Sequence, residues 1–234
     1  MNAARRWRVR LPLALAAAAC AGVHAAGDSA PAPGGPRVDR ARLPTAGSYT
    51  LARIQRCPDG EVLGSDGRAR RLHALLQGRL SVLSFMYTYC RDPVGCPLAN
   101  RAMAQTRDGL LADSALASRS QLVSLSFDPS NDTPAQMAIY GRGQADQRRL
   151  RWHFLTTASV PRLLPLLDGL GQDVSVETDA RGRPTRTLNH LMKLYLIDAG
   201  LWVREIYGVA TLDPAALIND LRTLALEARG PPRL

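Results

Sequence analysis

The chain has 234 residues, 46% of them hydrophobic, and a formal net charge of +10. Its 30 basic residues include one lysine, Lys193, and they are scattered without interleaved aromatic residues, which argues against a nucleic-acid-binding surface. The hydrophobic content suits the core of one domain.

The N-terminus is typical of a secretory signal peptide covering residues 1–25. Four arginines precede the short apolar stretch 11–19, and Val23-His24-Ala25 is a small-residue cleavage signal. Removal of this segment lowers the net charge to +6, because it contains four arginines and no acidic residue. An uncleaved membrane anchor and lipidation at Cys20 stay open as alternatives. Export predicts a periplasmic or other extracytoplasmic protein, either soluble or membrane-tethered, in an oxidising compartment.

Residues 26–47 are rich in proline and glycine and predict a flexible linker, so that residues 48–230 form the domain. The elements expected in chain order are a short strand at 49–55, a hairpin arm at 61–63, a helical turn at 72–76, a buried strand at 80–87, a helix at 97–111, a strand at 121–127, a helix capped by Thr133 and starting at Pro134, a strand at 151–156, a helix at 159–170, a hairpin of 191–197 and 201–207, and a final helix from Pro214 to about residue 228.

Strands that alternate with helices predict an α/β fold, with a mixed central sheet flanked by helices on both faces. Cys90 and Cys96 lie in the loop between the first long strand and its helix. This placement of a redox-capable pair makes the predicted fold thioredoxin-like.

The chemistry is concentrated in that loop, Cys90-Arg91-Asp92-Pro93-Val94-Gly95-Cys96. Pro97 suits a first helical position, so Cys96 is expected at a helix N-terminus, where the helix dipole stabilises a thiolate. Two thiols placed this way are able to form a disulfide, as a redox pair, or to bind a soft metal.

Cu(I) prefers thiolates, and an imidazole completes a three-coordinate site. His190, directly before the predicted hairpin strand, is the best-placed histidine, because in a thioredoxin-like sheet the loop before that strand faces the cysteine loop. His73 is expected to face solvent and His153 to have a packing role. Cys57 is left over as a buried or turn cysteine, or as a third redox group.

Six further residues near the loop have structural interpretations. Asp128 and Asp132 would orient the site or, as we favour, stabilise a turn and assist a helix cap. Strand packing accounts for Tyr87, Tyr89 and Met86, and a core position accounts for Met103.

Four motifs in this order resemble the Sco/SenC copper-chaperone proteins of cytochrome oxidase assembly: residues 85–90 leading into Cys96-Pro97, residues 128–134, Trp152-His153-Phe154-Leu155-Thr156, and His190 ahead of residues 194–200. The resemblance spans most of the mature domain. It implies a thioredoxin-like fold that binds one copper through Cys90, Cys96 and His190. It also implies partners: a copper-receiving oxidase subunit and, as a second partner, another copper chaperone.

The sequence departs from this family at two points. Five residues separate the cysteines where the family usually has three, and Asn189 precedes the histidine where the family usually has aspartate. The runner-up function is a thiol–disulfide oxidoreductase, which would need Cys90 and Cys96 but not His190.

Overall fold

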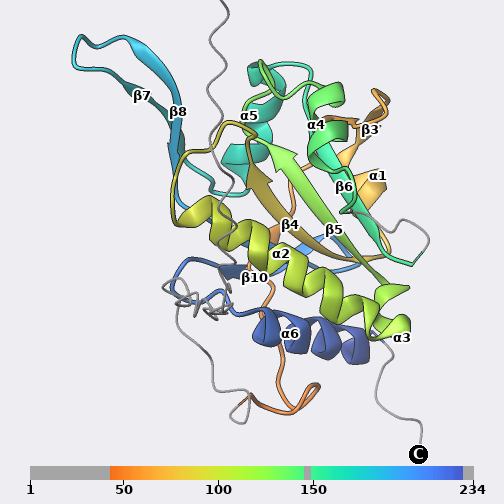
Figure 1. Cartoon of the computed structure of the whole chain (residues 1–234). Helices are drawn as coiled ribbons and strands as arrows, with labels where there is room; N and C mark the ends of the chain where they lie inside the picture. Colours follow the sequence, from red (N-terminus) through yellow and green to blue (C-terminus); the bar gives the residue numbers. More distant parts are fainter. Residues whose placement is uncertain (1–42, 145–148, 229–234) are drawn as a thin grey trace, which may run out of the picture. The chain divides into compact units, whose positions relative to one another are not determined.

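The computed structural model describes residues 43–144 and 149–228; the predicted signal peptide, Cys20 and the linker up to residue 42 lie outside them. An eight-stranded mixed sheet forms the centre of the domain (Figure 1). Its strands are β1 (Gln55–Arg56), β2 (Glu61–Gly64), β3 (Ala69–Arg71), β4 (Leu80–Met86), β5 (Ser120–Ser126), β6 (Arg151–Thr156), β9 (Leu194–Ile197) and β10 (Trp202–Tyr207). The helices are α1 (Leu72–Leu76), α2 (Gly95–Leu111), α3 (Ser114–Ala117), α4 (Pro134–Tyr140), α5 (Val160–Gly169) and α6 (Pro214–Glu227).

The strand order is β1-β10-β9-β4-β5-β6-β2-β3. β4, β5 and β6 run parallel, whereas β9 is antiparallel to β4 on its other side. Since parallel strands end at the same edge, the loops after β4 and β5 meet at the carboxyl end of the sheet. This edge carries the cysteine loop.

Alternation along β4 divides the core into two layers. Val82 packs toward α2, α3, α4 and α6, and Leu83 packs toward α1 and α5, so helices cover both faces. All of β5 and nearly all of β4 is buried, as expected of central strands. The predicted mixed sheet with helices on both faces is therefore confirmed.

Most expected elements occur within a few residues of their predicted bounds. Thr133 caps α4 through Gln136 N, and Asp213 caps α6 through two backbone amides. The strand expected at residues 49–55 is wrong, because regular pairing is confined to Gln55–Arg56, opposite β10. Helix α2 begins at Gly95, two residues earlier than predicted, which places Cys96 inside its first turn.

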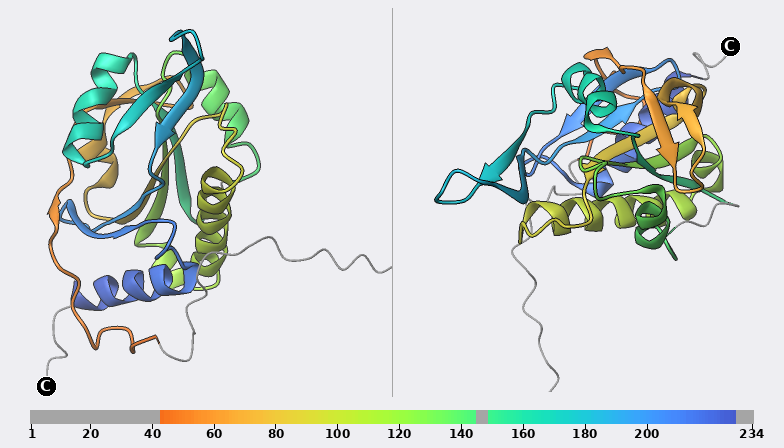
Figure 2. Two further views of the ribbon diagram at one scale, coloured as in Figure 1. Left: turned by 90° about the vertical axis from the view of Figure 1, so that its left-hand side faces the viewer. Right: turned by 90° about the horizontal axis from the view of Figure 1, so that it is seen from above.

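The short elements β3 and α3 were not predicted, and neither was a two-stranded hairpin of β7 (Val174–Thr178) and β8 (Pro184–His190). It extends away from the main sheet (Figures 1 and 2). Its turn is closed by Asp179, whose carboxylate accepts bonds from Arg181 N and Arg183 N, and Gly182 there has φ +74°. His190 is the last residue of β8, so this hairpin positions it. The predicted strand at 191–197 is correspondingly shorter, since only Leu194–Ile197 pair.

Candidate functional site

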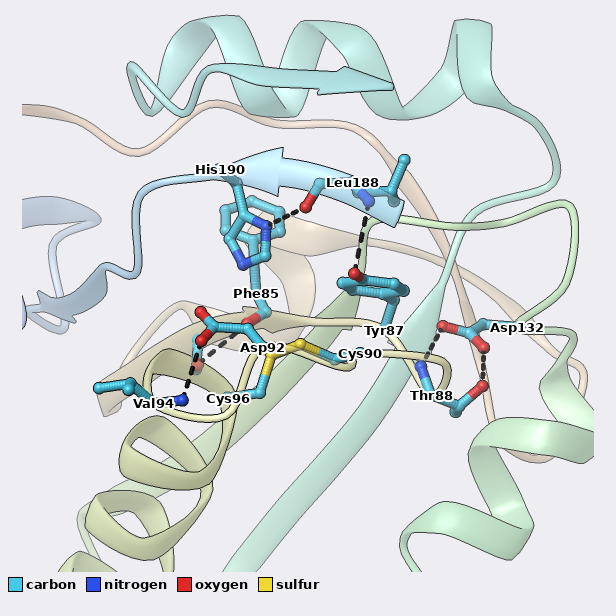
Figure 3. Close-up of a disulfide and its surroundings, with 11 residues drawn as sticks. Phe85, Tyr87, Thr88, Cys90, Asp92, Val94, Cys96, Asp132, Leu188 and His190 are labelled. Atoms are coloured by element: carbon cyan, nitrogen blue, oxygen red, sulfur yellow. Dashed lines mark hydrogen bonds between the residues drawn. A yellow bond between two sulfur atoms is a disulfide. The ribbon is translucent and has the colours of Figure 1, made fainter. Parts of the chain in front are cut away.

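The cysteine pair bridges the end of β4 and the start of α2. Cys90 and Cys96 form a disulfide with a Cα–Cα separation of 6.6 Å, within the range that a disulfide spans. The carboxylate of Asp92 accepts a bond of 2.8 Å from Val94 N, which folds the five intervening residues back toward the helix (Figure 3). The longer loop therefore still brings both sulfur atoms together.

A buried carboxylate binds the segment that leads from β4 into the cysteine loop. Asp132 is 1% exposed and accepts bonds from Thr88 N at 3.1 Å and from Thr88 Oγ1 (Figure 3). It also accepts a bond from Ser126 Oγ at 2.5 Å. The interpretation of Asp132 as a helix-cap residue is wrong, because its bonds join the cysteine loop to β5. Asp128 does stabilise its own turn, through Asn131 Nδ2 at 2.7 Å.

His190 lies above the disulfide in Figure 3, and its ring is close to two aromatic rings. The ring centroids of Phe127 and Tyr87 are 4.5 and 6.0 Å from that of the imidazole. His190 Nδ1 is 2.9 Å from Leu188 O. Because a carbonyl only accepts, Nδ1 carries the proton, and Nε2 keeps a lone pair on the side of the cysteine loop. Metal-binding histidines are oriented by such a bond to their second ring nitrogen.

Two tyrosines between β4 and the cysteine pair contact the base of the β7–β8 hairpin. The Tyr87 hydroxyl accepts a bond of 3.4 Å from Leu188 N. The guanidinium groups of Arg91 and Arg186 lie 4.6 and 4.1 Å from the centroid of the Tyr89 ring, a double cation–π contact between loop and hairpin. Strand packing alone therefore does not account for the two tyrosines. The contacts of Tyr87 and Tyr89 with β8 were not predicted, because the β7–β8 hairpin itself was not predicted.

Both cysteines and His190 line one pocket of about 320 Å³. Its lining also includes Tyr87, Asp92, Met86, Met103 and Met192. The pocket thus joins the cysteine loop, the base of β8 and the first turns of α2.

In this disulfide form, no group of three or more His, Cys, Asp or Glu side chains among the described residues is close enough to hold a metal ion. The donor set nevertheless fits a soft metal after reduction. Opening the disulfide provides two thiolates, and His190 Nε2 is uncommitted beside them.

The other predicted candidates lie elsewhere. Cys57 is 2% exposed, and burial raises the pKa of its thiol to about 12, so it is an unreactive core residue. His73 is half-buried rather than solvent-facing, and its Nε2 donates to Cys57 O at 2.8 Å. Burial, with the positive charge of Arg151 next in importance, lowers the pKa of His153 to about 4, which agrees with a packing role.

Within residues 43–144 and 149–228, no helix is both long enough and apolar enough to cross a membrane.

A model of the SCO1/SenC family matches residues 61–226. The chain belongs to the SCO1/SenC family. This match takes in β2 to α6 and hence the cysteine loop, Asp132 and His190. A search of the curated proteins finds no match.

Solved structures of the family are similar in fold. Arabidopsis thaliana ScoI with copper bound has a TM-score of 0.60 at 19% identity, covering 72% of this chain and 97% of that one. BsSco, a Sco-family cytochrome c oxidase assembly protein with a disulfide switch, has a TM-score of 0.59 at 17% identity, covering 76% and 98%. A SCO1/SenC family lipoprotein from Bacillus anthracis str. Ames has a TM-score of 0.58 at 22% identity, covering 76% and 99%. These likenesses establish the thioredoxin-like fold.

Proposed function

We propose that this chain is an exported copper-binding assembly factor that takes up Cu(I) through Cys90, Cys96 and His190 and delivers it to a copper centre of a respiratory oxidase. The observation that carries the proposal is the orientation of His190. Its Nδ1–H is committed to Leu188 O, which leaves Nε2 available in the pocket that the two cysteines line.

Copper is the cargo of this site. Uptake requires the reduced pair, so a partner dithiol supplies two electrons and two protons to open the disulfide and itself becomes a disulfide. Cu(I) then displaces the two thiol protons. Cys96 lies in the first turn of α2, where unpaired backbone N–H groups and the helix dipole stabilise its thiolate. Cys90 and Cys96 are half-buried and the loop residues Arg91 to Val94 are exposed, so a partner can approach the pair from the loop side.

Separate observations support export and an oxidase subunit as the partner. The N-terminal signal pattern and a disulfide between neighbouring cysteines both suit an extracytoplasmic compartment. The copper-bound Arabidopsis relative and the assembly role of BsSco support copper as the cargo and an oxidase subunit as the recipient.

The test is an anaerobic Cu(I) titration of the reduced full chain against a competing chelator. We expect one Cu(I) per chain at this site and a loss of affinity of at least 100-fold in Cys90→Ser, Cys96→Ser and His190→Ala. His73→Ala is the matched control, because His73 is also half-buried but does not line the pocket. Equal affinity in wild type and the two cysteine variants would contradict the proposal.

The second candidate function, thiol–disulfide exchange, is favoured by the closed Cys90–Cys96 bond itself. The two functions separate at His190. In His190→Ala, exchange with a dithiol partner would persist while copper delivery fails.

A further inference from the structure

The pocket contains a second set of sulfur atoms. The described residues include four methionines. Met137 and Met103 are both buried in the core, as predicted for Met103, at 0% and 2% exposed, but Met103 also lines the pocket, together with Met86 and Met192. Met86 and Met192 are only half-buried, so their side chains border open space instead of filling it. All three pack against the same core cluster, on the α2 face of the sheet.

Met86 and Met192 lie at the same end of the antiparallel pair β4 and β9. β4 and β9 are antiparallel, with Ser84 opposite Leu194. The paired segment of β9 begins at Leu194, and extending its register by two residues beyond that segment would place Met192 opposite Met86, on the same face. Directly opposed residues have Cβ atoms about 4.5–5.5 Å apart, so the two flexible thioethers are within reach of one ion.

The position of Met192 connects this pair to the cysteine loop. A Cβ atom built on Gly95 would lie 3.7 Å from Met192 Cβ, so Met192 contacts the first turn of α2 beside Cys96. The absence of a side chain at Gly95 allows this approach. Met103 follows two turns later on α2 and borders the pocket from the helix side.

The electrostatics of the pocket favour a cation. The chain has 30 basic and 20 acidic residues, yet the described residues that line the pocket include no lysine or arginine, and Asp92 contributes a carboxylate. Neutral thioethers are soft donors that suit Cu(I), and they cannot be removed by disulfide formation.

We propose that Met86, Met192 and Met103 form a second Cu(I) site, on the α2 side of the cysteine loop. The proposal rests on the proposed function, since it takes copper as the cargo. The thioethers hold Cu(I) while Cys90 and Cys96 are oxidised, and the thiolates take the ion by ligand exchange once the disulfide is open. The copper stays Cu(I) throughout, so this exchange needs no oxidant or reductant.

The test uses the full chain with Cys90→Ser and Cys96→Ser, labelled with selenomethionine and loaded anaerobically with Cu(I). Copper K-edge absorption should then show selenium as a direct neighbour of copper, which neither Cys57 nor His190 can produce. Adding Met86→Leu and Met192→Leu should remove the selenium signal and weaken Cu(I) binding at least tenfold. Met137→Leu is the matched control, because it is a core methionine outside the pocket. Methionine-to-leucine changes nearly conserve volume, so the variants keep the fold.

The outcomes separate the two proposals. If the double-serine protein shows no copper–selenium contact while reduced wild type binds Cu(I) through its cysteines, the thioether site is refuted and the proposed function stands. If wild type binds no Cu(I) at all, both proposals fail. If the Met137→Leu control loses as much affinity as the Met86/Met192 pair, the thioether site is again refuted.

Discussion

Replacing Asp132 by alanine should loosen the cysteine loop more than any other single polar change near it. The carboxylate is 1% exposed and accepts three bonds, from Thr88 N, Thr88 Oγ1 and Ser126 Oγ. Its removal leaves three donors without their acceptor. The two hydroxyl groups can rotate toward other acceptors, but the Thr88 amide is fixed by the backbone.

The expected cost follows from these bonds. A buried donor left without a partner costs about 1–3 kcal/mol, and bonds to a charged acceptor lie toward the upper end. Because the hydroxyls recover part of the loss, we expect Asp132→Ala to lower the free energy of unfolding by about 3–5 kcal/mol. With a urea m-value of about 2 kcal/mol/M, the unfolding midpoint would fall by about 2 M.

The assay is urea unfolding of the reduced proteins, with hydrogen exchange of the Thr88 amide as the local readout. Asp128→Ala is the matched control: Asp128 lies four residues away, and its bonds to Asn131 are local and solvent-exposed. We expect the control to lose less than about 1 kcal/mol. Equal losses of stability in both variants, or a Thr88 amide that stays protected in Asp132→Ala, would show that the bonds to Asp132 do not hold the cysteine loop.

Three further predictions follow from buried groups. The pKa of His153 is about 4 in the folded state against an ordinary 6.5, so the unfolded chain binds the proton more readily. The free energy of unfolding should therefore fall by roughly 2–3 kcal/mol as the pH drops from 6.5 to 4. His153→Gln should remove that part of the pH dependence of thermal unfolding. Arg204 is 4% exposed and forms ion pairs with Asp198 and Glu227 at 2.9 Å each. Arg204→Ala should therefore lower the free energy of unfolding in urea by about 3–5 kcal/mol. The control Arg70→Ala breaks an exposed ion pair and should cost under about 1 kcal/mol. Tyr87→Phe keeps the ring beside His190 but removes the acceptor for Leu188 N, and it should weaken Cu(I) binding about threefold to tenfold in a chelator competition; an unchanged affinity would show that this bond does not position the hairpin.

The sequence predicted much of the fold because its signals are local. The apolar run of β4 is followed at once by the cysteine loop and by helix α2, and Asp213-Pro214 starts α6. The hairpin of β7 and β8 was missed, although Val174, Val176 and Thr178 alternate before a turn at Asp179 to Gly182. Exposed polar residues fill this hairpin, so its hydrophobic alternation is weak.

The features of the site also fall into those that the sequence predicts and those that only the tertiary structure shows. Local order along the chain places the two cysteines between a strand and a helix, and four ordered motifs indicate the family, because both depend on neighbouring residues. Only the tertiary structure decides what Asp132 and Tyr87 do, since the bonds from Thr88 to Asp132 and from Leu188 to Tyr87 join residues 44 and 101 positions apart. The same holds for the free Nε2 of His190 and for the three thioethers in one pocket. Such contacts depend on strand order and register, which no local pattern contains.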